Sequence, residues 1–291
     1  MACSPVTSSM HGKTCLITGA NAGIGKAAAE SLTALGAQVV MVCRNRERGE
    51  RARAEISSAA QKGGRGGGVE LLIADLSSQS EIRAVARDIG AAHPKIDVLV
   101  NNAGLALKQR EFTVDGIERT FAVNYLAYFM LANLLLPALR AAEHARIINV
   151  ASGAHASGKL EFDNLQGERR YRNIAMYAAS KLEDVMFTYA LARRLAGTSI
   201  TVNTLHPGVV ATEIWRQVAI LRILSRWFML SPEKGARTTV YLAASPDVEQ
   251  MNGQYFDKCQ PAKTTAISHD EMLQEQLWDV SAALTGVGSE I

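Results

Sequence analysis

The chain has 291 residues, of which 48% are hydrophobic and 20% are charged, and its formal net charge is +3. This length is enough for one large α/β domain or two small domains, and the apolar content is enough for a full core, which excludes a disordered or fibrous protein. The charge is small and no basic run contains interleaved aromatic residues, so the composition gives nucleic-acid binding little support and suits a small anionic ligand.

The N-terminus, MACSPVTSSMHGK, lacks the apolar region of a signal peptide. No stretch reaches the roughly 18 uninterrupted apolar residues that a membrane-spanning helix needs. The four cysteines, Cys3, Cys15, Cys43 and Cys259, have no metal-ligand spacing, and two of them fall in apolar runs. We therefore expect four free thiols in a reducing compartment, no bound metal, and a soluble cytoplasmic protein.

Six short apolar runs alternate along the chain with segments of helical pattern. Nearly continuous apolar residues indicate strands that are buried on both faces, and the alternation with helices indicates a parallel sheet. We predict a single α/β domain with a doubly wound parallel sheet over residues 1–291, with its core over 10–210. The runs are KTCLIT (13–18), QVVMVC (38–43), VELLIA (69–74), IDVLVNN (96–102), ARIINVAS (145–152) and SITVNTLHP (199–207). The glycine-rich segment QKGGRGGG (61–68) falls between a helix and a strand, and reads as a loop without function rather than a phosphate cradle.

A glycine-rich turn, TGANAGIG, follows the first predicted strand directly. Gly19, Gly23 and Gly25 permit a tight bend and let a pyrophosphate approach the backbone, where the N–H groups of a helix N-terminus stabilise its charge. Asn21 and Ile24 belong to the same turn. The position of the glycines in the first strand–helix unit predicts a dinucleotide site.

The end of the second predicted strand indicates which dinucleotide is bound. An acidic residue there would bind the ribose 2′-OH of NAD, but this sequence reads VCRNRER and has no carboxylate before Glu47. Arginine can bind a 2′-phosphate through two hydrogen bonds, so Arg44 favours NADP(H) over NAD(H). Arg46, Arg48 and Arg51 read as exposed residues of the next helix.

Two further strand ends contribute candidate cofactor residues. Asp75, followed by Leu76, either accepts from the adenine amino group or caps the next helix. NNAG (101–104) ends the fourth predicted strand, where ligands lie in such sheets. Asn101, Ala103 and Gly104 therefore belong near the cofactor or in the turn that shapes its pocket.

Residues 173–194 read as an amphipathic helix that carries Tyr177 and Lys181. Residues four apart lie on the same helix face, so the ammonium would lie close to the phenol. A free tyrosine, with a pKa of about 10, is a poor proton donor at neutral pH, and a nearby positive charge favours the phenolate. The pair is either a tuned acid or ordinary helix surface.

The motifs together resemble the short-chain dehydrogenase/reductase family, whose members have a Rossmann-type fold. TGANAGIG, NNAG, Asn124 in FAVNYL, Ser152 in INVASGAH, YAASK (177–181) and HPGVVATE (206–213) occur in the family's order over nearly the whole chain. Within the family the sequence resembles the retinol dehydrogenase group, through CRNRERGE, AHASGKLEFDNL, the helix at 177 and the tail EQLWDVSAAL. Ser152 precedes Tyr177 by 25 residues, a longer gap than the family's usual dozen or so, and that group shares it.

The resemblance implies four catalytic residues. Tyr177 would donate the proton to the carbonyl oxygen as NADPH delivers hydride, and Lys181 would favour ionisation of the phenol and bind the nicotinamide ribose. Ser152 would hold the substrate oxygen, and Asn124 would anchor a water that leads protons to solvent. Singly, Ser152 also reads as a turn residue and Asn124 as a helix-interior amide that bonds backbone. His155 invites a Ser/His hydrolase reading, but no GxSxG turn precedes it, so we expect a loop residue.

The resemblance also implies a cofactor-closing segment and a substrate lid. Pro207, Gly208 and Thr212 would contact the nicotinamide carboxamide, although Pro207 alone reads as a strand breaker and Thr212 as a cap. Residues 211–231 would form the lid, and the bulky apolar sequence of 215–230 indicates a hydrophobic substrate such as a retinoid, steroid or long-chain aldehyde or ketone. A core helix or a membrane-surface helix explains 215–230 as well, so peripheral membrane contact stays open.

Residues 232–291 would form C-terminal helices and a last strand, and the apolar positions of 270–287 would pack on the domain or on a partner subunit. Family members often pair through the helices after the fourth and fifth strands, which would include 177–196, so a homo-oligomer is a further expectation. The apolar stretch at 126–139 suits either that interface or burial in the monomer. We predict an NADP(H)-dependent oxidoreductase, mainly a carbonyl reductase. The alternatives are a non-catalytic NADPH-binding sensor or scaffold, and a sugar-nucleotide epimerase, against which the glycine spacing and the length argue.

Overall fold

An eight-stranded sheet forms the centre of the computed structural model, which describes residues 3, 6–62, 66–208 and 230–288. The strand order is β3-β2-β1-β4-β5-β6-β7-β8, and every neighbouring pair is parallel except β7 with β8. The chain thus winds outward from β1 in both directions, which confirms the predicted doubly wound sheet. The strands are β1 (Thr14–Thr18), β2 (Gln38–Cys43), β3 (Val69–Ile73), β4 (Val98–Asn101), β5 (Ala145–Val150), β6 (Ile200–His206), β7 (Tyr255–Asp257) and β8 (Gln260–Pro261).

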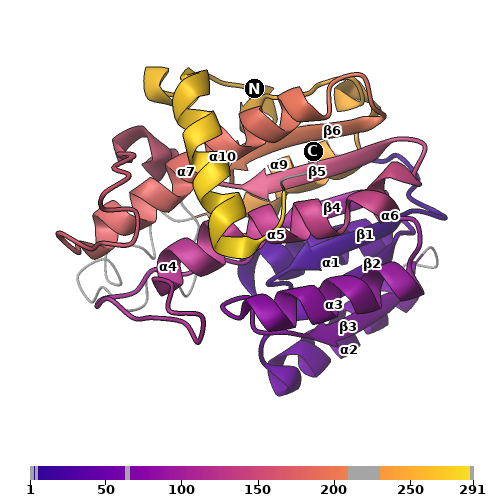
Figure 1. The fold of residues 1–291 in the computed structure, drawn as a ribbon. Helices are drawn as coiled ribbons and strands as arrows, with labels where there is room; N and C mark the ends of the chain where they lie inside the picture. The colour runs from indigo at the N-terminus through magenta and orange to yellow at the C-terminus, as the bar shows by residue number, and fades with distance from the viewer. Residues whose placement is uncertain (1–2, 4–5, 63–65, 209–229, 289–291) are drawn as a thin grey trace.

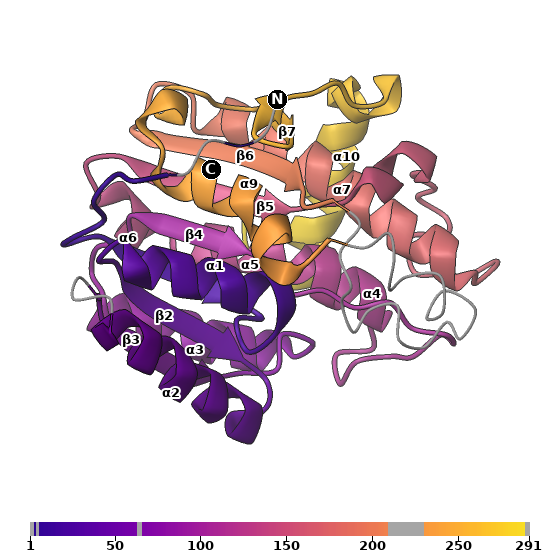
Figure 2. The same cartoon turned by 180° about the vertical axis from the view of Figure 1, so that it is seen from behind.

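Helices cover both faces of this sheet. On one face lie α1 (Gly23–Ala34), α2 (Arg46–Lys62) and α9 (Pro232–Ala244), which Figure 2 shows in front. On the other face lie α3 (Gln79–Ala92), α5 (Ala127–Leu134) and α7 (Asn173–Arg194), with α10 (Glu271–Thr285) packed outside them (Figure 1). No helix in the described ranges is both long and apolar enough to cross a membrane. The shorter elements are α4 (Arg119–Phe121), η1 (Ala122–Leu126), α6 (Leu136–Arg140), η2 (Gly153–Ser157), η4 (Pro246–Val248) and η5 (Ala266–His269).

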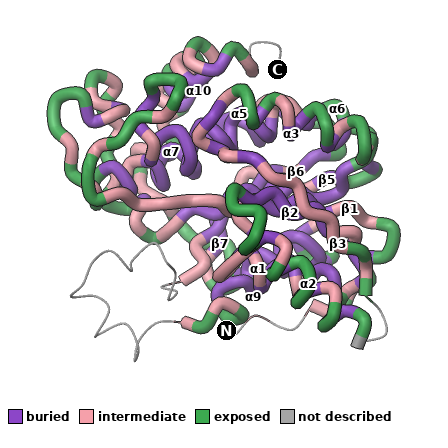
Figure 3. The backbone as a smooth tube through the Cα atoms, turned by 90° about the horizontal axis from the view of Figure 1, so that it is seen from below, coloured by how far each residue is buried: buried purple, intermediate pink, exposed green. Residues whose placement is uncertain are grey.

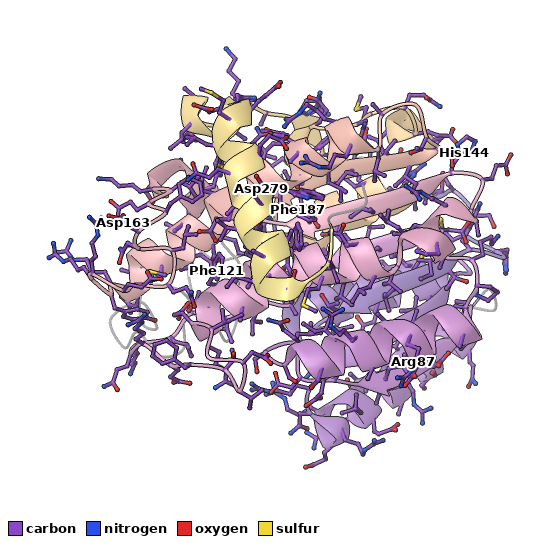
Figure 4. All side chains as sticks on the ribbon, in the orientation of Figure 1. Arg87, Phe121, His144, Asp163, Phe187 and Asp279 are labelled. Carbon is purple, nitrogen blue, oxygen red and sulfur yellow. A yellow bond between two sulfur atoms is a disulfide. The ribbon has the colours of Figure 1, made fainter. Side chains whose placement is uncertain are left out.

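Two apolar cores lie between the sheet and its helical layers, as the buried strands of Figure 3 indicate. The core beneath α10 contains packed aromatic rings from five elements: Phe121, Tyr125, Phe129, Phe187 and Trp278. Phe121 and Phe187 point inward there, whereas Arg87, Asp163 and His144 lie at the periphery (Figure 4). The apolar stretch after residue 126 is buried within this core, so the chain itself covers it.

Helix α7 differs from its predicted amphipathic form. Nearly every residue from Met176 to Ala192 is buried, because the sheet lies on one side and α10 lies on the other. Leu277 and Trp278 of α10 complete this cover, whereas Met272 is 80% exposed. The C-terminal helix therefore packs on its own domain.

The prediction that all four cysteines are free is wrong for two of them. Cys3 and Cys259 form a disulfide across a sequence separation of 256 residues, whereas Cys15 and Cys43 are free and buried in β1 and β2. The fold brings the N-terminal segment beside the turn between β7 and β8, and no spacing rule indicates such a pairing. The inference of a reducing compartment thus loses the support of these two cysteines.

Candidate active site

A cavity of about 570 Å³ opens at the carboxyl ends of the central strands, where α/β sheets bind ligands. Most of the residues predicted for the site line it, although they come from the whole length of the chain between β1 and the segment after β6. Thr212 and most of the expected lid lie outside the described residues. The predicted residues that line the cavity are Gly19, Asn21, Gly23, Ile24, Gly25, Arg44, Asp75, Leu76, Ala103, Gly104, Ser152, Tyr177, Lys181, Pro207 and Gly208.

The glycine turn forms one wall of the cavity. Gly19 has φ +67°, a left-handed conformation that favours glycine. A Cβ on Gly25 would lie 2.4 Å from Asn102 Nδ2 and 2.6 Å from the Gly19 carbonyl oxygen, so only glycine fits there. Ala22, the N-cap of α1, has no side-chain capping bond, and the first turn has no acidic residue. The turn and the helix N-terminus together suit an anionic group such as a pyrophosphate.

Residues after β4 are held against the end of β1. The Thr18 hydroxyl accepts from the backbone N–H groups of Asn102 at 2.8 Å and Ala103 at 2.9 Å, and Asn102 Nδ2 donates to the Thr18 carbonyl at 2.8 Å. Asn102 lines the cavity, whereas the predicted Asn101 does not. Asn101 is fully buried and donates to Asn149 at 2.9 Å, so it supports the turn from behind.

The end of β2 brings two arginines to the cavity. Arg44 lies there as predicted, with Nη1 3.9 Å from Asp75 Oδ2, and both side chains are partly exposed. Arg48, in the first turn of α2, also lines the cavity, although the sequence placed it on an exposed helix face. The Asp75 carboxylate accepts from the Ser77 N–H at 2.9 Å and is not the cap of α3, since Ser78 holds that position.

Lys181 reaches the cavity from the buried interior of α7. Its Nζ donates to the Val150 carbonyl at 3.0 Å and to Asp184 Oδ2 at 2.8 Å, and it lies 5.3 Å from the centre of the Tyr128 ring. Burial is the largest effect and lowers the pKa of this ammonium, but the Asp184 carboxylate, together with Tyr128 and Tyr177, more than offsets it, so the pKa is raised. Burial raises the pKa of Asp184, and the charge of Lys181 opposes that rise.

Tyr177 and Ser152 line the same cavity as Lys181. Tyr177 lies one turn before Lys181 on α7 and is only 7% exposed. Ser152 caps η2, and its hydroxyl accepts from the Ala154 N–H at 3.2 Å. His155 is buried in η2, and its Nδ1 bonds the backbone carbonyl of Ser152 at 2.7 Å, so no His155–hydroxyl pair of the hydrolase type is formed.

Asn124 is fully buried in η1, a π-helical turn, and does not line the cavity. Its Oδ1 accepts from the Leu105 N–H at 2.8 Å, and its Nδ2 donates to the Leu105 carbonyl at 2.9 Å and to Ser180 Oγ at 3.0 Å. π-Helical turns are rare and often mark functional sites. The side chain here connects the loop after β4 to α7 beside Lys181.

Comparison with known proteins agrees with this geometry. The chain matches the family described as short chain dehydrogenase over residues 13–220. It belongs to the short-chain dehydrogenase family. Retinol dehydrogenase 14 of Homo sapiens is 42% identical to this short-chain dehydrogenase, over 96% of this chain and 88% of its own length. Both the family and the retinol dehydrogenase-like resemblance are thus confirmed, and the activity class is that of an oxidoreductase acting on alcohol or carbonyl groups.

Solved structures share the fold of this short-chain dehydrogenase. The crystal structure of an uncharacterized protein from Mycobacterium paratuberculosis has a TM-score of 0.80 at 30% identity and covers 99% of this chain and 98% of its own. The Pseudomonas aeruginosa RhlG/NADP active-site complex has a TM-score of 0.70 at 27% identity and covers 87% of this chain and 97% of its own. The predicted Rossmann-type architecture is confirmed.

His206 is a cavity residue of this short-chain dehydrogenase that the sequence pattern did not single out. It ends β6, and its Nδ1 accepts from the Gly153 N–H at 3.0 Å, next to Ser152. Only a neutral imidazole can accept this bond. Its place directly before Pro207 in HPG was the available signal. The other cavity residues that were missed are Ala22, Val42, Cys43, Asn45, Arg48, Ala74, Asn102, Leu105, Val123, Val150, Ala151 and Pro232.

We expect the folded protein to lose stability in acid because of His206. Burial lowers the pKa of His206 in the folded protein; Asp257 opposes this shift and His155 adds to it. The neutral imidazole therefore contributes fully to the stability of the fold above the unfolded pKa of about 6.5. This contribution is lost as the pH falls through the lower pKa of the folded state. His206→Asn keeps an acceptor near Nδ1 but does not titrate, so its melting temperature should fall less than that of the native protein between pH 7 and 5. Thermal unfolding across this range measures the effect, with His206→Leu, which lacks the acceptor, as the control. If the melting temperatures of the native protein and of His206→Asn fall equally with pH, this assignment is contradicted.

Proposed function

We propose that the protein is an NADP(H)-dependent oxidoreductase that transfers hydride between nicotinamide and a hydrophobic alcohol or carbonyl, mainly as a carbonyl reductase. One observation carries this proposal: Ser152, Tyr177 and Lys181 line the same cavity as the glycine turn and Arg44. A dinucleotide held at the glycine turn would extend toward the tyrosine and lysine, since both ends belong to one cavity. Such a cavity would let the bound cofactor and the catalytic side chains approach one substrate.

The residues present fit a phosphorylated dinucleotide. A Cβ does not fit at Gly25, and the positive φ of Gly19 disfavours a side chain there, which leaves the backbone open to a pyrophosphate. Arg44 and Arg48 line the cavity at the end of β2, where a 2′-phosphate would need guanidinium groups. The structurally similar RhlG was solved as an NADP complex, which supports the same preference here. When bound, NADPH supplies the hydride.

The protein side chains would manage the proton and the substrate oxygen. Tyr177 would donate a proton to the carbonyl oxygen, or accept one from an alcohol in the reverse direction. Ser152 would hold that oxygen and stabilise its developing charge. Lys181 would present its ammonium to the cavity, and Asn124 would hold the loop at Leu105 and lead protons toward solvent.

The substrate would be hydrophobic. Leu105, Val123 and Ala151 add apolar surface to the cavity. The human relative is named a retinol dehydrogenase, so retinoids are the first class to test, followed by steroids and long-chain aldehydes or ketones. The expected lid at 211–231, peripheral membrane contact, a cytoplasmic location and a homo-oligomer stay predictions.

The proposal is tested by measuring NADPH oxidation with purified protein and a panel of apolar aldehydes and ketones, including retinal, with NADH in parallel. Turnover that is faster with NADPH supports the proposal. Tight NADPH binding without turnover of any compound in a broad panel would favour the sensor alternative instead. Turnover of a sugar nucleotide without net NADPH consumption would favour the epimerase alternative.

Arg44 gives a specific prediction of cofactor preference. Arg44→Ala should raise the Kd for NADPH by about tenfold and change that for NADH little, because only the 2′-phosphate loses a charged partner. Fluorescence titration with both cofactors measures the change. Arg51→Ala is the matched control, since Arg51 pairs with Glu47 on α2 and does not line the cavity. An equal loss of affinity for both cofactors would contradict the assignment.

A further inference from the structure

A buried carboxylate lies directly behind the cavity lysine. Asp184 is three residues beyond Lys181 on α7, and its Oδ2 accepts from Lys181 Nζ at 2.8 Å. Asp184 is 0% exposed and Lys181 is 3% exposed. Among the described residues, Asp184 Oδ1 has no hydrogen-bond donor, so the carboxylate is committed to Lys181.

This ion pair fixes the orientation of the Lys181 ammonium and its N–H donors. An ammonium has three N–H donors, and the Asp184 carboxylate and the Val150 carbonyl accept two of them. Lys181 also lines the cavity. The third N–H is the one left for the Tyr128 hydroxyl, which interacts with Lys181, or for a molecule bound in the cavity. A lysine without the two acceptors would choose among many rotamers, because its side chain has four rotatable bonds.

We propose that Asp184 is a positioning residue, which holds Lys181 as a charged ammonium directed at the cavity. The inference rests on the proposed function, in which Lys181 acts beside Tyr177. Burying two charges is costly, so such a pair adds little net stability over an apolar one. The role of this pair would be to present a positive charge at the reaction site.

Asp184 is the counter-charge of Lys181, because the neighbouring acidic groups have raised pKa values. Burial, then the nearby charges of Asp184 and Glu118, raises the pKa of Glu183 well above its ordinary value, which favours its uncharged form. Burial likewise raises the pKa of Tyr128 and of Tyr125, which stay uncharged. In the part of the chain that the structure describes, the titratable groups that interact with a member of the pair are Tyr177, Glu183, Tyr128 and Tyr125, and Glu118 acts on Glu183.

Asp184→Asn tests the proposal, because it keeps the shape and an acceptor but removes the charge. Burial would then act on Lys181 without the Asp184 charge that offsets it, so the ammonium should deprotonate at a pH lower by about one unit or more. Glu183→Gln is the matched control. It changes the neighbouring buried acid, whose uncharged form is favoured by burial and which has no hydrogen bond to Lys181.

Two measurements on each protein decide the outcome. The first is the NMR titration of the Lys181 side chain in protein labelled with 13Cε-lysine, with the signal assigned from Lys181→Arg. The second is the pH dependence of kcat for carbonyl reduction. We expect Asp184→Asn to move both the Lys181 titration and the alkaline limb of kcat downward by about one unit, and Glu183→Gln to match the native protein.

An unchanged Lys181 titration in Asp184→Asn would overturn the proposal, and so would a shifted titration with an unchanged kcat profile. If the native protein reduces no carbonyl, the proposed function fails, and the Lys181 titration alone decides whether Asp184 sets the charge of the cavity lysine. If Asp184→Asn does not fold, thermal unfolding of Lys181→Met/Asp184→Asn replaces it. Restored folding in the double variant supports the ion pair, and a double variant that is no more stable overturns it.

Discussion

Replacing Tyr177 with phenylalanine is expected to lower kcat for carbonyl reduction by roughly a hundredfold to ten-thousandfold, the usual contribution of a positioned general acid. The ring stays in place, because Tyr177 is almost completely buried on α7 and phenylalanine fills the same space. Only the hydroxyl that would donate the proton is lost. NADPH should still bind at the glycine turn and the arginines, so fluorescence titration should show a similar Kd.

Tyr189→Phe is the matched control for this experiment. Tyr189 lies on the same helix, its hydroxyl bonds Thr264 at 2.9 Å, and it does not line the cavity. This variant should lose about 1 kcal/mol of stability and keep kcat within about twofold. Unchanged kcat in Tyr177→Phe would remove Tyr177 from the mechanism, and equal losses in both variants would point to damage of α7 instead.

The six long strands were predictable because their signal is local. Each is a continuous apolar run, and each observed strand ends within two residues of its prediction. The short strands β7 and β8 have only three and two residues, so no periodicity defines them, and the sequence placed a last strand only somewhere within 232–291. Their position depends on pairing with the edge of β6.

The sequence predicted the site residues that are marked by a backbone constraint or by the end of a strand. It did not predict the residues whose role depends on contact with a distant element. Gly25 carries such a local constraint. Asp184, in contrast, is one acidic residue among many in the sequence. It becomes a buried partner of Lys181 only because α10, about 90 residues later in the chain, contributes to the cover over α7. The Cys3–Cys259 disulfide was missed for the same reason.

Gly25→Ala is expected to destabilise the fold and to weaken cofactor binding together. The added Cβ would meet the side chain of Asn102 and the backbone of Gly19, and backbone cannot move aside as a flexible side chain can. Such overpacking costs about 1 to 3 kcal/mol in the free energy of unfolding. The atoms that must shift also shape the anion-binding turn, so the Kd for NADPH should rise by about tenfold or more.

Gly90→Ala separates this steric effect from the general effect of adding a methyl group to a helix. Gly90 lies in α3, where a Cβ would meet nothing within 4 Å. Alanine there should stabilise the protein by about 0.5 to 1 kcal/mol, because glycine loses more backbone entropy on folding. Urea unfolding without cofactor measures both stabilities, and NADPH titration measures binding.

If Gly25→Ala gains stability as Gly90→Ala does, the close approach of Asn102 and Gly19 does not restrict that position. If instead Gly25→Ala is destabilised but binds NADPH normally, the turn is a packing constraint alone, and the cofactor site must be sought along another wall of the cavity.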